Sequence, residues 1–452
     1  MSPDGLLIAG TLLARRRMHQ RDRWSRDRML EFQGVELDRL LAYARTSSPY
    51  YQQVLPGAAH VPLTDLPVLT KSMLMDQWDR ICTSPALRLA QVEGRLSEME
   101  RTGADPGHPW RGRWWLAGTG GTTGRRAVFA WDRREWTQIL TSYARVNDWA
   151  GVAVGLRHPL RTAVVSSLNP THQSAVVGAS LRSRLVPALR LDARTPVADL
   201  TGELDRFEPR LLVAYASMIG PLAQAQLTGQ LHIRPEKVVA ASEVLTPASR
   251  SAAQAAWGPS VIVDSYAATE TASIASTCSQ GGWHLYEDFV IVEPVDEDYQ
   301  PVPAGATADR VLVSVLFSRT LPLIRYELTD SIRLSPERCT CGLPFALLEA
   351  VEGRTEDTIT LPGRHSSVRV HPNVFHNALE ALAPNGWQVE QQPNKLVVRL
   401  VAPAGGTELV RRRVQEALAD LTIDPVAVDV VSVTALERTR LGKVPLVKAL
   451  PA

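Results

Sequence analysis

A glycine-rich segment is the part of this sequence whose residue types point most directly to chemistry. Residues 118–126 read Gly-Thr-Gly-Gly-Thr-Thr-Gly-Arg-Arg. Glycine lets backbone amides approach phosphate oxygens, threonine hydroxyls donate further hydrogen bonds, and arginine supplies positive charge. The spacing is neither that of a P-loop nor that of a dinucleotide-binding turn, because Arg125 and Thr123 stand where those motifs require glycine. We therefore expect an anion-binding loop of a third kind, with a tight hairpin turn as the alternative.

The elements that surround this segment have the pattern of an α/β protein. Helical spacing of apolar residues covers 36–46 and 134–149, and short apolar runs predict buried strands at 162–168, 210–214, 237–241 and 260–264. Between the last two strands, Thr246 and Pro247 predict a helix start and Gly258 predicts its end. Strands alternating with helices predict a parallel sheet covered by helices.

The second half of the chain changes pattern twice. Runs at 289–292, 310–317 and 331–334 predict a strand-rich subdomain, and 395–401, 407–421 and 427–433 predict a small α+β unit of two strands and a helix. A glycine and a polar run separate these patterns at 353–357. We therefore expect a large domain over 1–353 and a small domain over 354–452.

Composition excludes several classes of protein. The chain has 452 residues, of which 45% are hydrophobic and 21% charged, which is typical of a globular protein and not of a disordered one. Lys+Arg 49 against Asp+Glu 47 gives a net charge of +2, so binding to nucleic acid through phosphate neutralisation is not expected. Four cysteines cannot form a disulfide framework, and we expect a cytoplasmic protein.

The N-terminal region has two features that could be mistaken for a membrane element. The apolar run 5–14 is too short to span a bilayer, and the following residues 15–28 carry seven arginines. A solvated helix face is the favoured interpretation of these arginines, with a membrane-surface or partner-binding helix as the alternative. The acids crowded between 287 and 298 are likewise expected to form a solvated loop face.

The glycine-rich segment resembles the phosphate-binding loop of the adenylate-forming enzymes, the superfamily of acyl-coenzyme A ligases and adenylation domains. Five further motifs match that family in order: Ala241-Ser242-Glu243, the segment 265–270 ending Thr269-Glu270, Pro322 to Asp330, Gly353 to Asp357, and Gly442-Lys443 near the end. The resemblance implies a small domain that rotates about a hinge at 353–357. It also implies ATP and Mg²⁺ as cofactors.

Site residues follow from this resemblance. It implies that Lys443 and Arg354 are catalytic and that Glu270 is catalytic and binds magnesium. Residues implied to bind the nucleotide are Thr119, Gly121, Thr122, Thr123, Gly124, Arg125, Ser242, Glu243, Asp264, Tyr266, Thr269 and Asp330. His172, Tyr215 and Ala267 are implied to line the acyl pocket, although a locally hydrogen-bonded loop histidine is the alternative for His172.

Segments 43–51 and 66–71 resemble the phenylacetate-coenzyme A ligase branch, which implies an aromatic acid. That branch also implies a zinc site formed by Cys278, His284, Cys339 and Cys341. Three cysteines and one histidine are suited to a closed structural zinc site, whereas reduced cysteines in a surface turn are the alternative.

The predicted reaction is adenylation of a carboxylic acid by ATP, followed by transfer to coenzyme A. Residues 361–367 depart from the family's pantetheine-guiding form, so an amine or a carrier protein remains an alternative acceptor. A non-catalytic nucleotide-binding homologue is the alternative from another class. No nucleic-acid or membrane partner is expected, and the basic N-terminal helix could support a homodimer.

Overall fold

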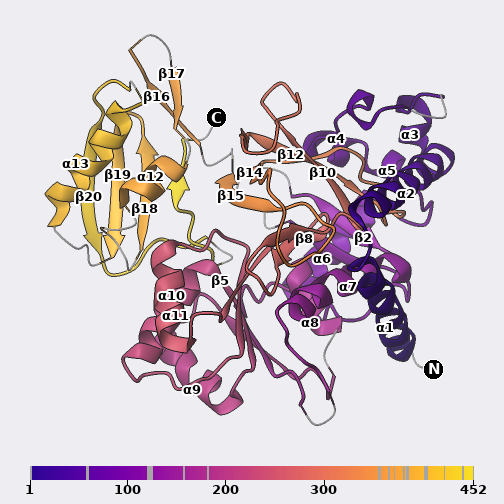
Figure 1. Ribbon diagram of the computed structural model, residues 1–452, viewed down its shortest axis with the longest axis horizontal. Coiled ribbons are helices and arrows are strands. Elements are labelled where there is room, and N and C mark those ends of the chain that lie inside the picture. Colours follow the sequence, from indigo (N-terminus) through magenta and orange to yellow (C-terminus); the bar gives the residue numbers. More distant parts are fainter. Residues whose placement is uncertain are drawn as a thin grey trace.

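The computed structural model describes residues 3–57, 61–119, 126–155, 158–180, 183–354, 358–364, 367–370, 372–379, 382, 386–401, 406–421, 423–439 and 442–450. Figure 1 shows a large part and, beside it, a smaller part formed by the C-terminal residues. The mixed α/β class predicted from the sequence is confirmed. None of the described helices combines the length and the hydropathy needed to cross a membrane.

A seven-stranded sheet in the order β4-β3-β5-β6-β7-β8-β9 forms the centre of the large part. The strands from β4 to β7 are parallel, and β8 and β9 extend the sheet in antiparallel fashion. Their bounds are β3 Thr162–Ser166, β4 Ala188–Asp192, β5 Leu211–Tyr215, β6 Lys237–Ala241, β7 Ile262–Ala268, β8 Ala272–Thr277 and β9 Trp283–Leu285. The predicted parallel sheet is therefore present, with its strands close to the expected positions.

Helices lie on both faces of this sheet (Figure 1), and they pack more densely on one face than on the other. On one face, α9 Val197–Phe207, α10 Ala216–Leu227 and α11 Pro247–Trp257 pack against alternate residues such as Leu212 and Ala214 in a dense core. α11 begins as predicted, because the Thr246 hydroxyl caps it by accepting from the Ser249 amide. The opposite face lies toward α7 Arg133–Trp149 and α8 Gln173–Ser180, and residues of this face and of both helices line a common cavity.

The N-terminal helices share a hydrophobic core with a two-stranded hairpin. They are α1 Pro3–Arg21, α2 Arg26–Ser47, α3 Pro49–Val54, the 3₁₀ helix η1 Leu63–Asp65, α4 Lys71–Asp76, α5 Trp78–Ile81 and α6 Leu89–Thr102. The hairpin strands β1 Trp115–Gly118 and β2 Val128–Trp131 are fully buried and lie on either side of the glycine-rich segment. The two buried strands therefore position the ends of the glycine-rich segment.

The prediction of solvated faces for the N-terminal arginines and for the acids near 287 is wrong in part. Asp288 is fully buried and accepts two hydrogen bonds from Arg145, at 2.6 and 2.8 Å. Arg21 also pairs with Asp288, and Arg26 donates to Glu287 at 2.9 Å. These ion pairs therefore hold α1 and α2 against the rest of the large part.

Two three-stranded sheets form the predicted strand-rich subdomain. One contains β10 Val290–Val295, β12 Arg310–Val315 and β13 Tyr326–Leu328, and the other contains β11 Thr307–Ala308, β14 Asp330–Leu334 and β15 Leu348–Arg354. The first strand of the smaller part is β16, and it follows β15 in the chain.

The smaller part has its own hydrophobic core, which begins at Ile359 and includes Trp387. Its four-stranded sheet has the order β20-β19-β18-β21, with α12 and α13 packed together. The bounds are β16 Ile359–Pro362, β17 Ser367–Val370, α12 Pro372–Leu379, β18 Trp387–Gln392, β19 Lys395–Val401, α13 Gly406–Ala419, β20 Ala427–Val433 and β21 Val447–Lys448. A domain boundary after residue 353 agrees with this separate core and stays a prediction.

Candidate functional site

A cavity of about 1400 Å³ lies at the carboxyl ends of β5, β6 and β7 and is bordered by a segment of the smaller part. Open parallel sheets bind their ligands at this edge. The cavity brings together these predicted site residues: Thr119, His172, Tyr215, Ser242, Glu243, Asp264, Tyr266, Ala267, Thr269, Glu270, Asp330 and Lys443. The predicted residues Gly121, Thr122, Thr123, Gly124 and Arg125 lie outside the described residues.

Thr119 closes the base of the glycine-rich segment. Its backbone amide donates to the Ala127 carbonyl at 2.9 Å, and its hydroxyl accepts from the Ala127 amide at 3.1 Å. A Cβ at Gly118 would lie 2.1 Å from Nε of Arg126, so a larger residue there would displace the arginine side chain. Thr119 therefore holds the two ends of the segment together through its amide and its hydroxyl oxygen, and the hydroxyl keeps its hydrogen for donation to a bound phosphate.

Lys443 enters the cavity from the smaller part. Its Nζ lies 3.5 Å from the Ser242 carbonyl oxygen and 5.7 Å from the centre of the Tyr215 ring. Gly442 has φ +82° and packs against Arg194, so glycine suits both the backbone angle and the close approach. The turn therefore presents the lysine at the carboxyl ends of β5 and β6.

Glu243 joins the two parts of the molecule. One carboxylate oxygen accepts from the amide of Val444 at 2.9 Å, and the other accepts from the amide of Ser217 at 3.0 Å. Arg438 adds a second link, since it donates to the Gly442 carbonyl at 2.8 Å and lies 3.2 Å from Sδ of Met218. Both oxygens of Glu243 therefore position the lysine turn in this arrangement.

Tyr266 and Asp330 form a pair at the next side of the cavity. The tyrosine hydroxyl donates to Oδ2 of Asp330 at 2.8 Å. Asp330 begins β14, and Arg354 is its register partner at the end of β15, so the two residues lie side by side in the backbone ladder. The structure thus places two residues assigned to the nucleotide next to each other, with the predicted catalytic residue Arg354 on the adjoining strand.

Two acidic residues on either side of Tyr266 have different surroundings. Glu270 is largely buried and lies 3.4 Å from the Tyr326 hydroxyl, which can donate to it. Asp264 accepts from Arg250 at 2.6 Å. Glu270 therefore has the better surroundings for a cation, whereas the charge of Asp264 is balanced by arginine.

His172 lies in the cavity between the glycine-rich segment and the lysine. Burial, together with the positive charges of Lys443 and Arg126, lowers its pKa to about 4. Its Nε2 is buried and has no hydrogen-bond partner among the described residues. A neutral imidazole with an unused nitrogen is suited to contact a bound molecule. The alternative of a histidine fully satisfied by local hydrogen bonds is therefore wrong for the described residues.

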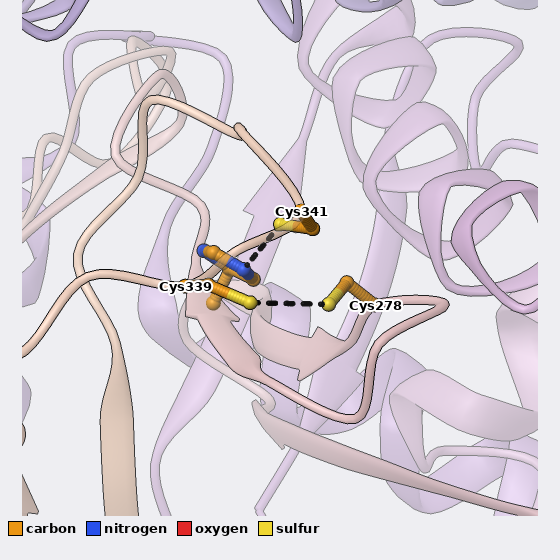
Figure 2. Close-up of side chains that lie close together, drawn as sticks. Cys278, Cys339 and Cys341 are labelled. Atoms are coloured by element: carbon orange, nitrogen blue, oxygen red, sulfur yellow. Dashed lines mark hydrogen bonds between the residues drawn. The ribbon is translucent and has the colours of Figure 1, made fainter.

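The four predicted zinc ligands meet away from this cavity's nucleotide end. The ligand atoms of Cys278, His284, Cys339 and Cys341 all lie within 4.8 Å of one another. Figure 2 shows Cys278 and Cys339 directed toward each other, with their sulfurs 3.8 Å apart. Two thiolates about 2.3 Å from one tetrahedral zinc would be about 3.8 Å apart, so the donor set fits this metal.

The surroundings of the cluster also suit a metal. Nδ1 of His284 lies 3.1 Å from the Phe345 carbonyl, which fixes the ring and leaves Nε2 directed to Cys341 at 3.2 Å. Burial lowers the pKa of His284, which favours the neutral ligand form. A Cβ at Gly282 would lie 2.7 Å from Sγ of Cys339, so a side chain there would disturb the cluster.

Three supporting residues were missed by sequence reasoning: Arg250, Tyr326 and Arg438. Tyr326 lies 56 positions from Glu270, Arg250 lies 14 from Asp264, and Arg438 bonds to Gly442 four positions along the chain. None of the three has a local motif of its own. Tyr326 stands inside the segment that ends at Asp330, which was the only available signal for it.

A scan against models of known families finds no match. A search of curated proteins finds phenylacetate-coenzyme A ligase from Thermus thermophilus, 33% identical over 102 residues. This similarity covers 22% of the chain and 22% of that enzyme, so the match spans about a fifth of the relative's length.

Solved structures match over nearly the whole chain. 2-Hydroxyisobutyryl-CoA ligase in the postadenylation state has a TM-score of 0.71 at 19% identity, covering 95% of this chain and 91% of that one. The chain therefore has the fold of this CoA ligase. An open conformation of the same ligase gives a TM-score of 0.61 at 18% identity, covering 93% and 92%. An anthranilate-CoA ligase, AuaEII, gives 0.50 at 19% identity, covering 73% and 65% of the two chains. The similarity to 2-hydroxyisobutyryl-CoA ligase therefore extends over both the large part and the smaller part.

Proposed function

We propose that this protein is an AMP-forming ligase that adenylates a carboxylic acid with ATP and transfers the acyl group to coenzyme A. The observation that carries the proposal is the position of Lys443. A cation from the smaller part lies over the carboxyl ends of β5 and β6, in the same cavity as Glu270 and Asp330. That constellation supports a reaction in which negative charge develops at phosphorus.

The chemistry requires positioning and positive charge. A carboxylate is a poor acyl donor because its leaving group would be oxide, and attaching AMP to one of its oxygens turns that oxygen into part of a good leaving group. A bond forms between a carboxylate oxygen and the α-phosphorus, and the bond from that phosphorus to pyrophosphate breaks. Lys443 is placed to stabilise the developing charge. No general base is needed, because a carboxylic acid is already ionised at neutral pH.

The remaining roles follow from position. Asp330 and Tyr266 would hold the ribose, with Arg354 on the neighbouring strand, and Ser242 would border the base. Glu270 would bind magnesium, which neutralises phosphate charge when it is bound. Residues 121–125 would hold the phosphates. The Cys278, His284, Cys339 and Cys341 cluster would bind structural zinc, since four protein ligands leave no position for a reactant.

Coenzyme A is the acceptor favoured by the comparisons, because the named neighbours of this fold are CoA ligases. Their acids include both an aliphatic hydroxy acid and an aromatic one, so the fold itself does not select an aromatic substrate. The small domain beginning at residue 354 would have to move away from the cavity to admit the thiol.

The test is pyrophosphate release from ATP and magnesium over a panel of carboxylic acids, each with and without coenzyme A. We expect acid-dependent release and a thioester detected by mass spectrometry. Release without thioester would replace coenzyme A by another acceptor, such as an amine. ATP binding with no release for any acid would overturn the proposed function.

A further inference from the structure

The cavity continues well past the residues assigned to the nucleotide. Along β5, Tyr215 lies at the end near Lys443, and Val213 and Leu211 continue the same lining toward the other end of the strand. Leu212 and Ala214, which alternate with them, face the opposite core. Since a parallel strand rises about 3.3 Å per residue, the lining from Tyr215 to Leu211 is about 13 Å long.

Apolar side chains from both sides line this extension, here called the distal channel. They are Leu140 and Val146 of α7, Leu160, Val164 of β3, Val177 of α8, Val186, Leu211 and Val213 of β5, and Val239 of β6. The volume of the whole cavity, about 1400 Å³, exceeds the roughly 300–1,000 Å³ of ordinary ligand pockets. The cavity is therefore larger than an ordinary single-ligand pocket.

Three of the polar side chains along the distal channel are hydrogen-bonded to the protein. Tyr143 donates to Gln173 at 2.9 Å, Gln173 donates to the Thr269 carbonyl at 2.9 Å, and Thr162 donates to the Leu160 carbonyl at 3.2 Å. A ligand group here gains little from polar contacts and gains from burial of apolar surface. The occupant that fits is a hydrocarbon chain.

The distal channel ends at an apolar rim. Ile8 and Leu12 of α1, Val154 and Leu185 line it, and each of these side chains is more than a third exposed. The charged residues beside them, Arg15 and Asp148, are paired at 2.8 Å. Figure 1 shows α1 at the end of the molecule away from the smaller part, so the rim lies opposite the Lys443 end.

Gly178 of α8 is a lining position of the distal channel at which a larger side chain can be tested. It lines the cavity, and a Cβ added to it would meet nothing within 4 Å. It stands six residues after His172, and at 1.5 Å per residue this places it about 9 Å along the helix from the site end. A larger side chain at Gly178 has room to project into the distal channel.

Resting on the function proposed above, we infer that the acid carries an extended apolar chain that fills the distal channel. Its carboxylate lies at Lys443 and its tail runs between β5 and α8 toward α1. With single bonds of about 1.5 Å, a chain of about ten carbons covers the 13 Å of lining. A small aromatic acid would fill only the part near Ala267.

The first experiment measures kcat/KM for pyrophosphate release with saturated acids from butanoate to tetradecanoate, with phenylacetate and benzoate alongside. We expect kcat/KM to rise about three- to fourfold per methylene up to about decanoate and then to stop rising. Preference for phenylacetate or benzoate, with no gain from chain length, would overturn the inference and leave the proposed function standing.

The second experiment substitutes Gly178→Leu, with Gly202→Leu as the matched control. Gly202 also lies inside a helix, α9, with nothing within 4 Å of an added Cβ, and it is absent from the cavity lining. Gly178→Leu should lower the ratio of kcat/KM for decanoate over butanoate by about tenfold or more, whereas Gly202→Leu should leave the ratio unchanged. An unchanged ratio in Gly178→Leu would contradict the inference.

A binding measurement with decanoate tests the distal channel independently of the proposed ligase activity. If no acid supports pyrophosphate release, the ligase activity is wrong, and calorimetric binding of decanoate then tests the distal channel directly. Binding by the unmodified protein and by Gly202→Leu, weakened about tenfold in Gly178→Leu, supports an apolar-chain site. Absence of decanoate binding to the unmodified protein overturns it.

Discussion

The Nζ of Lys443 lies 3.5 Å from the carbonyl oxygen of Ser242, although 201 positions separate the two residues in the chain. Ser242 has φ +65°, in the left-handed region that a serine seldom adopts. Such backbone strain is retained where the surrounding structure enforces it, and it often occurs at functional sites. Here it lies at the end of β6, where the backbone meets the turn of the smaller part.

Substitution Lys443→Ala should lower kcat/KM for pyrophosphate release by at least about a hundredfold, because the developing charge loses its cation. ATP binding measured by calorimetry should change little, since the lysine is assigned to the transition state. Lys448→Ala is the matched control, because that lysine pairs with Glu437 at the surface of the same part. Unchanged release in Lys443→Ala would remove the lysine from the mechanism.

Substitution Glu243→Gln should lower kcat about tenfold. The amide group in place of one carboxylate oxygen cannot accept the hydrogen bond from Val444 or Ser217, and such a loss costs about 1–3 kcal/mol. Stopped-flow measurement of the adenylation step tests this directly. Glu236→Gln, which affects only an ion pair with Arg210, should retain full activity. Equal kcat in both variants would show that the lysine turn does not depend on Glu243.

Removal of a zinc ligand should destabilise the protein without altering the cavity. Cys339→Ser should abolish the zinc content measured by mass spectrometry and lower Tm by about 5 °C or more. Cys82→Ala serves as the control, because Cys82 is buried far from the cluster in sequence and is not one of its members. Metal-free protein with an unaltered Tm after exhaustive chelation would contradict a structural zinc.

Lowering the pH should lower the free energy of unfolding, because the buried His172 resists protonation in the folded protein. Burial, with the charges of Lys443 and Arg126, lowers its pKa from 6.5 to about 4, so the unfolded chain binds more protons between these values. The free energy of unfolding therefore falls as pH falls through this window, by as much as about 3 kcal/mol from this group. Urea unfolding at pH 7 and pH 5 should show a smaller loss for His172→Gln than for the exposed-site control His232→Gln. Identical losses would exclude His172 as the cause.

Local elements could be predicted because their signals lie within a few residues. Lys237–Ala241 is the strand its apolar run predicts, and α11 starts after Thr246 and stops before Gly258 as its caps require. The neighbouring strand β7 extends to Ala268, beyond the predicted end at Asp264, because it also pairs with β8. That extension depends on a partner strand and leaves no mark in the local pattern.

Errors arose where partners are distant in the chain. The acids Glu287 and Asp288 look like part of a solvated loop, but their arginine partners Arg26 and Arg145 lie 261 and 143 positions away. Burial of such a charge is tolerated only when a partner compensates for its desolvation. No window of the sequence contains both members of these pairs.

The sequence by itself determined the order of the elements and the chemical groups available: the glycine-rich segment, the acids after β7, the cysteines and the lysine near the C-terminus. The tertiary structure alone decided that Glu243 holds the lysine turn, that Tyr266 donates to Asp330, and that a channel lies between β5 and α8. The reason is physical. Caps, turns and apolar periodicity act over a few residues, whereas a cavity is the space left when distant elements pack, and its shape depends on all of them together.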